Sequence, residues 1–312
     1  MKFPAEENNY QQISECENTC LGASPTKNQT FIILGLIIFT GFLLRLWGTS
    51  NFGLHGDEET TAMAALSILE DGSPRCPSGM LYLRAILHSY FIAFSVMILG
   101  HEEWALRLPS VLAGTLEIGF VYFLGKRFLP YWWNLLLVIA VALNPDLIQY
   151  SQTARMYIFF SASLVLFTVM IFKWERTGRI KDLLTAFFCF IIALQFQSLT
   201  IFSAFLFFFP YITSPSKKRL YHSLVAFSLA GIAFKVNSFF ISAQYNSAKL
   251  SPAFVKSVTK QMTFPYLMVD HILILGLLAL LCIIVLLWFA RLRRYNGISW
   301  YISMGREKGT GE

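Results

Sequence analysis

The sequence has few charged residues. They make up 14% of its 312 residues, while 55% of the residues are hydrophobic. A soluble globular domain carries about 25% charged residues, so this chain has too little polar surface for a soluble fold and is predicted to be a polytopic membrane protein. The net charge is +7, but the basic residues fall in short loops between apolar runs, where they orient a membrane protein. This pattern argues against nucleic acid as a partner.

Cysteine is also scarce, with five residues in the chain. Cys16 and Cys20 form a close pair without a nearby histidine, so neither a zinc site nor a disulfide framework is indicated. The sequence contains no glycine-rich phosphate loop, no His/Cys metal spacing and no nucleophile motif. It also contains no internal repeat, whereas a transporter or lipid flippase is often built from two related halves.

What the chain does contain is long apolar runs. A membrane-spanning helix needs about 20 apolar residues, and two of the predicted segments, 181–196 and 198–213, are short. We predict an all-α membrane domain over 31–290, between a polar, disordered cytoplasmic tail (1–30) and a basic polar cytoplasmic tail (291–312). The candidate segments are 31–47, 80–99, 104–125, 131–147, 156–174, 181–196, 198–213, 222–241 and 267–290.

Basic residues cluster at the ends of alternate segments. Counting crossings from segment 104–125 onward places every cluster on one side of the membrane, which the positive-inside rule makes cytoplasmic. The loops at 145–155 and 242–266 are then external. The clusters are Lys126-Arg127, residues 173–181, residues 217–219 and residues 291–294.

Segment 80–99 decides the side on which the preceding acidic stretch lies. Hydropathy alone favours a crossing, which would place residues 54–59 in the cytoplasm. On a helix, however, Arg84, His88 and Ser95 share one stripe, and an arginine near midspan costs about 2.5–3.5 kcal/mol on insertion scales. A helix with a polar stripe can lie along the interface instead. We prefer this interpretation, which leaves eight crossings and makes the acidic stretch external.

Asp57 and Glu58 lie in that acidic stretch, Leu54-His55-Gly56-Asp57-Glu58-Glu59. One interpretation is structural: Asp57 is the N-cap of a short amphipathic helix that Gly72 ends, and the following glutamates suit its first turn. The other is chemical: carboxylates beside a membrane can act as a general base or bind a divalent cation. The sequence leaves both interpretations open.

A second polar stretch, from Asn144 to Tyr157, precedes the segment that begins at residue 156. Arg155 is either a membrane anchor or a phosphate ligand, to which its forked guanidinium is suited. Asp146 adds an acid on the same face. The stretch from His101 to Ser110 is interpreted as interface charges with an aromatic anchor. Glu117 and Lys235 lie inside apolar segments, where charges are costly and therefore functional candidates.

These features in this order resemble the GT-C membrane glycosyltransferases. The motifs are Asp57-Glu58, an amphipathic helix, a second interfacial helix, Glu103 to Gly114, and Asn144 to Tyr157. The subgroup they resemble includes the protein mannosyltransferases, the aminoarabinose transferases and the Rgt-type galacturonosyltransferases. The resemblance implies a GT-C helical bundle of about eight transmembrane helices, with two interfacial helices in an external loop. It also implies a polyprenyl-phosphate-linked sugar donor and a lipid, glycan or protein acceptor.

The resemblance further implies roles for individual residues. Asp57 is the expected catalytic base of an inverting transfer, and Asp146 is the expected second acid. Glu58 and Asp146 are expected to position the acceptor, or Asp57 and Asp146 to hold a divalent cation if one takes part. Other expected substrate-binding residues are Tyr150, Arg155, Tyr157, Arg75 and Lys235.

One motif departs from the resemblance. The aminoarabinose transferases carry Glu-Lys-Pro-Pro before the second loop helix, whereas this chain has Pro74-Arg75-Cys76-Pro77-Ser78-Gly79. Arg75 is the expected replacement for the lysine. The expected location is a plasma (inner) membrane with the site facing outside, or the endoplasmic reticulum in a eukaryote. A transporter or flippase and a catalytically inactive membrane subunit remain as alternatives.

Overall fold

The computed structural model describes residues 26–50 and 53–247, and the regular structure in these ranges is helical. The prediction of an all-α polytopic membrane protein is confirmed. The tail before residue 26, segment 267–290 and everything from residue 291 onward lie outside the described residues. The helices are α2 (Lys27–Leu46), α3 (Asp57–Asp71), α4 (Ile86–Leu99), α5 (Glu103–Gly125), α6 (Tyr131–Leu143), α7 (Pro145–Ser151), α8 (Tyr157–Thr177), α9 (Ile180–Phe196), the 3-10 helix η1 (Ser198–Phe208), α10 (Phe209–Thr213) and α11 (Lys217–Ser247).

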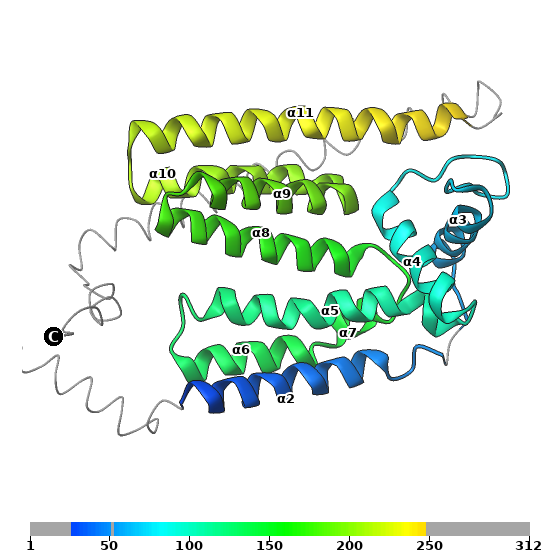
Figure 1. Cartoon of the computed structure of the whole chain (residues 1–312), viewed down its shortest axis with the longest axis horizontal. Helices are drawn as coiled ribbons and strands as arrows, with labels where there is room; N and C mark the ends of the chain where they lie inside the picture. Colours follow the sequence, from blue (N-terminus) through cyan, green and yellow to red (C-terminus); the bar gives the residue numbers. More distant parts are fainter. Residues whose placement is uncertain (1–25, 51–52, 248–312) are drawn as a thin grey trace, which may run out of the picture.

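The long helices run side by side, and α3 and α4 lie together at one end of this bundle (Figure 1). Within the described residues, α2, α5, α8 and the Lys217–Ile241 part of α11 are long and apolar enough to cross a membrane. Helices α6 and α7, which meet at a bend of 52°, make a fifth crossing if they are counted as one span. The described part therefore accounts for four or five of the eight predicted crossings. At 17 residues, α9 is just shorter than the usual span.

Aromatic side chains hold one half of the bundle together. Phe167, Phe190 and Phe207 are fully buried and contact one another with ring centroids 5.3–5.7 Å apart, which joins α8, α9 and η1. A smaller apolar cluster around Ile118 and Val138 joins α2, α5 and α6. Large apolar side chains also cover the outside of the bundle. That surface suits lipid, since a bilayer core does not penalise exposed hydrocarbon.

The structure of segment 80–99 supports the interfacial interpretation. Helix α4 begins only at Ile86 and has 14 residues, so it spans about 21 Å at about 1.5 Å per residue, less than the ~30 Å hydrocarbon core. The predicted polar stripe is partly wrong, because Arg84 precedes the helix and is exposed. His88 and Ser95 are buried, and the Ser95 hydroxyl donates to the Ala105 carbonyl at 2.6 Å. This bond fastens α4 to α5.

The three described basic clusters lie at the end of the bundle opposite α3 and α4 (Figure 1). There Arg127 Nη2 lies 2.5 Å from Glu175 Oε2, and Arg219 Nη2 donates to the Glu175 carbonyl at 2.9 Å. The three described basic clusters thus gather at one end of the bundle, as the counting of crossings predicts. The bundle has a basic end and, at the other end, a polar site.

Candidate functional site

Asp57 is the first residue of α3 but not its cap. The N-cap is Gly56, with φ +55° and ψ −110° and no side-chain capping bond. This conformation is open to glycine and strained for other residues. The N-cap interpretation of Asp57 is therefore wrong by one position, although α3 does end at Gly72 as predicted. The side chain of Asp57 is 73% exposed, so its carboxylate is accessible from outside the helix.

Asp57 instead pairs with Arg155, which lies 98 residues later in the chain. Arg155 Nη2 lies 2.6 Å from Asp57 Oδ2, and Nη1 donates to the Asp57 carbonyl oxygen at 3.1 Å. The Arg155 guanidinium lies over the Tyr157 ring, 5.5 Å from its centroid. That ring is 5.7 Å from the ring of Tyr150. The structure thus brings four of the predicted site residues together.

The Arg155 side chain is only 8% exposed, against 73% for its partner. Burial acts to lower the pKa of its guanidinium, but the hydrogen bond to Tyr157 and the electrostatic interactions with Tyr82 and Asp57 raise the pKa above its ordinary value. Arg155 is therefore a fixed cation beside an exposed carboxylate. Tyr82 is buried and follows a small hairpin closed by the Arg75–Leu81 bridge. Tyr82 cannot be found from the sequence, because a lone tyrosine between loop residues carries no signal.

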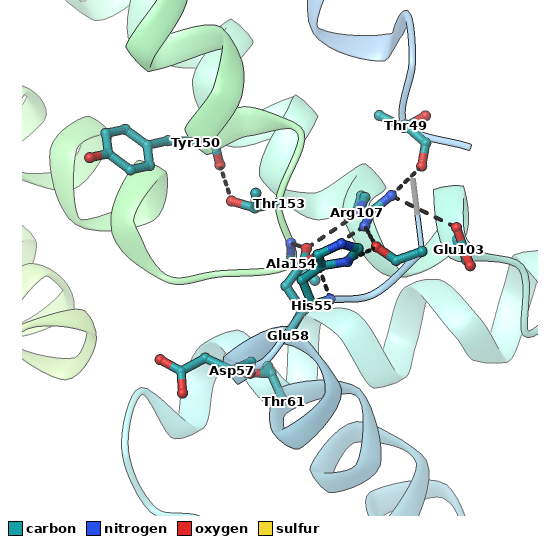
Figure 2. A network of polar contacts seen from close by, with 11 residues as sticks. Thr49, His55, Asp57, Glu58, Thr61, Glu103, Arg107, Tyr150, Thr153 and Ala154 are labelled. Carbon is teal, nitrogen blue, oxygen red and sulfur yellow. Dashed lines mark hydrogen bonds and ion pairs between the residues drawn. The ribbon is translucent and has the colours of Figure 1, made fainter. Parts of the chain in front are cut away.

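Glu58, next to Asp57, points the other way and is buried against Arg107 (Figure 2). It accepts four hydrogen bonds. Arg107 Nε and the Ala154 amide donate to Oε1 at 3.3 and 2.6 Å, and Arg107 Nη2 and the His55 amide donate to Oε2 at 3.0 and 3.3 Å. An ionised carboxylate has about four acceptor positions, so Glu58 is saturated. It ties α3 to α5 and to the loop that carries Arg155.

The interpretation of the stretch from His101 to Ser110 as interface charges is wrong for Arg107, which is buried inside the protein. Its side chain is 4% exposed, and it also donates to the carbonyl oxygens of Thr49 at 2.6 Å and Gly53 at 3.1 Å. Arg107 therefore holds the segment leading to Asp57 as well as Glu58. The signal that could have found it is an arginine four residues into an apolar helix, where it needs a buried acid.

His88 lies in the protein interior close to Arg155. It is 1% exposed, and its ring packs edge-on against Phe159 with 5.0 Å between centroids. Burial and the charge of Arg155 lower the pKa of His88 to about 3. The imidazole is therefore neutral at physiological pH, and Arg155 is the cation at this position.

The remaining predicted residues lie apart from the Asp57–Arg155 pair. Asp146 is exposed in the first turn of α7. Arg75 is exposed on its hairpin, and its Nε donates to Ser73 Oγ at 3.1 Å. Lys235 is exposed on α11. Within the described residues no contact joins these three side chains to Arg155. Glu117 has a partner that the sequence did not reveal: Ser161 Oγ donates to its Oε1 at 2.5 Å.

The residues expected to hold a divalent cation do not form a ligand set. In residues 26–50 and 53–247, no group of three or more His, Cys, Asp and Glu side chains is placed to hold a metal ion. Asp57 is already engaged by Arg155. Asp57 and Asp146 therefore do not fit a divalent cation in the part of the chain that the structure describes.

Comparison with protein families places part of the chain in a known family. The family described as dolichyl-phosphate-mannose-protein mannosyltransferase matches residues 84–241, just over half of the 312 residues. The matched range includes Arg107 and Arg155, while Asp57 and Glu58 precede it. No curated protein sequence matches the chain.

Proposed function

Because the chain belongs to the dolichyl-phosphate-mannose-protein mannosyltransferase family, whose members are GT-C glycosyltransferases with polyprenyl-phosphate sugar donors, we propose that it transfers a sugar from such a carrier at the membrane face where α3 and α4 lie. The acceptor is a lipid, glycan or protein hydroxyl or amine. The observation that carries this proposal is the pair of Asp57 and Arg155. It sets an exposed carboxylate against a buried cation at one end of a membrane bundle.

In the proposed reaction the two members of the pair separate. The anionic phosphate of the donor competes with Asp57 for the Arg155 guanidinium, a group suited to phosphate. Asp57 then becomes a free carboxylate that the acceptor nucleophile can reach. The ion pair is thus the resting form of the site.

Asp57 next accepts a proton from the acceptor nucleophile as that atom attacks the anomeric carbon. The bond between the anomeric carbon and the phosphate oxygen breaks, and the electron pair leaves with the carrier phosphate. Arg155 stabilises the charge that develops on this phosphate. A single displacement of this kind inverts the anomeric configuration. Tyr157, whose ring lies against Arg155, and Tyr150, whose ring lies beside that of Tyr157, form an aromatic wall for the sugar.

An apolar cavity of about 380 Å³ provides a place for the first isoprene units of the carrier. It lies between the segment before α4 and helices α9 and α11, and Ala85 and Met156 belong to one apolar cluster beside it. Met156 follows Arg155 directly and Ala85 precedes Ile86 of the cavity wall, so this apolar cluster links the loop of Arg155 to the cavity wall. The cavity is lined by Leu83, Ile86, Ile191, Leu194, Gln195, Ala233, Val236, Asn237 and Phe240.

Glu58 receives a positioning role in this proposal instead of a substrate-binding one. All four of its acceptor positions are taken by protein donors, and one of these donors is the Ala154 amide directly before Arg155. Glu58 therefore fixes the backbone next to both members of the pair. Asp57 directly precedes Glu58, and Arg155 directly follows Ala154. Asp146, Arg75 and Lys235 stay as candidate contacts for larger parts of the substrates.

Replacing Arg155 tests the proposed function. In nanodiscs containing the full chain and a panel of polyprenyl-phosphate sugars, Arg155→Gln should reduce the transfer rate by about 10²–10³-fold, the usual cost of removing a donor that stabilises the developing charge. Arg155→Lys should reduce the transfer rate less, because lysine keeps the positive charge although it lacks the two parallel donors of the guanidinium. The control is Arg176→Gln, an exposed arginine at the basic end of α8. Undiminished transfer by Arg155→Gln would contradict the role of Arg155, and no transfer from any donor by the unaltered chain would contradict the function.

The face of the membrane is tested separately by cysteine labelling. Glu59→Cys and Arg176→Cys, each placed in a chain without its native cysteines, put one exposed thiol at each end of the bundle. On intact cells, a membrane-impermeant maleimide should label the cysteine at position 59, while the cysteine at 176 should react only after permeabilisation. The reverse pattern would place the site on the cytoplasmic face.

A further inference from the structure

The bend between α6 and α7 releases backbone carbonyls inside the bundle. The two helices meet at Asn144 at 52°. In a continuous helix the Val141 carbonyl would accept from residue 145, but Pro145 has no N–H. The Ala142 carbonyl loses its partner as well, because the chain changes direction and Asn144 starts a new helix by accepting from the Leu147 amide at 3.0 Å. Buried carbonyls of this kind need other donors.

Arg45, near the end of α2, supplies those donors. Its Nη2 donates to the Val141 carbonyl at 3.2 Å, and Nη1 donates to the Ala142 carbonyl at 3.0 Å. The side chain is fully buried. Room for it comes from Gly114, where an added Cβ would lie 2.1 Å from Ser151 Oγ and 3.1 Å from Arg45 Nε. The guanidinium thus fills the bend while α5 and α7 close over it.

A buried acid lies near Arg45 without pairing with it directly. Glu117 on α5 is 3% exposed, and its Oε1 accepts from Ser161 Oγ on α8 at 2.5 Å. In the described residues no ion pair joins Glu117 to Arg45. The Arg45 guanidinium is therefore held by carbonyl oxygens, including that of Gly41 at 3.1 Å.

A second set of hydrogen bonds joins the end of α7 to α2. The Gln152 side chain, directly after α7, donates through Nε2 to the carbonyls of Leu44 at 3.1 Å and Trp47 at 2.5 Å. These carbonyls lie at the C-terminal end of α2, where helical partners are missing. Arg45 on α2 therefore binds the carbonyls at the end of α6, where the bend begins. Gln152, directly after α7, binds the carbonyls at the end of α2.

We propose that Arg45 is a positioning residue for the transfer reaction: by occupying the carbonyls that the Asn144–Pro145 bend releases, it sets the direction of α7 and so places Arg155 opposite Asp57. The inference rests on the proposed function. Arg45 joins α2, which leads to Asp57, to the last turn of α6, from which the bend turns the chain into α7 and on to Arg155. Misplacement of a catalytic group by about 1 Å can cost about 10²-fold in rate.

The variant Arg45→Lys tests this inference. Lysine keeps the charge, but its single ammonium lacks the fork that serves two neighbouring carbonyls. We expect kcat to fall by about 10–10²-fold, with a much smaller change in the KM for the donor, because the phosphate can still bind Arg155. The matched control is Arg176→Lys at an exposed position, which should change neither constant.

A distance measurement on the same full-length variants separates positioning from general damage. Spin labels at two exposed positions, Met63 on α3 and Gln149 on α7, should give a narrow distance distribution in the unaltered chain and a broader or shifted one in Arg45→Lys. If Arg45→Lys does not fold, Gln152→Ala takes its place, since it removes the second set of hydrogen bonds from a less buried side chain.

Each combination of results decides the question. Reduced kcat together with a changed distribution supports the inference. Reduced kcat with an unchanged distribution, or a changed distribution with unchanged kcat, overturns it, as does no change in either. If the unaltered chain transfers no sugar, the proposed function fails, while the spin-label distances still decide whether Arg45 holds α7.

Discussion

Asp57→Asn is expected to lower the rate of sugar transfer by about 10²–10⁴-fold, the range that a general base contributes. Asparagine has the shape of aspartate but cannot accept the proton from the acceptor. The fold should tolerate the change, because the side chain is 73% exposed and the amide oxygen of asparagine can still accept a hydrogen bond from Arg155. The measurements are the initial transfer rate and the thermal midpoint of the purified chain.

Two further variants sharpen this test. Glu59→Gln removes an exposed acid from the same turn of α3 and should leave transfer unchanged. Asp57→Ser would preserve function if Asp57 served only to cap the helix, because serine is a good N-cap. Since Gly56 occupies the cap position, we expect Asp57→Ser to be as inactive as Asp57→Asn. Normal turnover by Asp57→Ser would contradict the role of Asp57 as the general base.

The sequence predicts the Asp57–Arg155 pair better than the Glu58–Arg107 pair. Asp57 and Arg155 can be found because each is a charged residue where an apolar run begins or ends, and charges at such positions lie at a membrane face. The pairing of Glu58 with Arg107, 49 residues apart, leaves no local pattern. A charge four residues inside an apolar helix can face lipid, water or protein, and only the folded position of Glu58 opposite Arg107 decides which.

The fold shows the same division. Apolar runs predict where α5 and α8 lie to within a few residues, because each run must match a helix. They do not predict that α4 starts as late as Ile86, or that Gly56 instead of Asp57 caps α3, since both depend on the turns that join the helices. Arg45 looks like an ordinary end-of-span residue in the sequence. Its function at the α6–α7 bend depends on a proline 100 residues later.

The buried pair of Glu58 and Arg107 should show the largest effect on stability. Removing one member of a buried ion pair costs about 3–5 kcal/mol, because the other charge is left without a partner. Arg107→Met and Glu58→Gln should therefore both lower the free energy of unfolding strongly. Lys173→Met is the control: its pair with Asp182 is half exposed, with 55% of the lysine side chain accessible, and should contribute only about 0–1 kcal/mol.

The double variant Glu58→Met/Arg107→Met separates stability from positioning. It removes both charges at once, so much of the lost stability should return, as apolar replacements of buried pairs often allow. Sugar transfer should not return, because the Ala154 amide has lost the acceptor that it binds at 2.6 Å and Arg155 follows Ala154 directly. Chemical denaturation in detergent and the transfer assay measure the two quantities on the same samples. Transfer that recovers in step with stability would mean that Glu58 supports the fold alone, and that Arg155 reaches Asp57 without it.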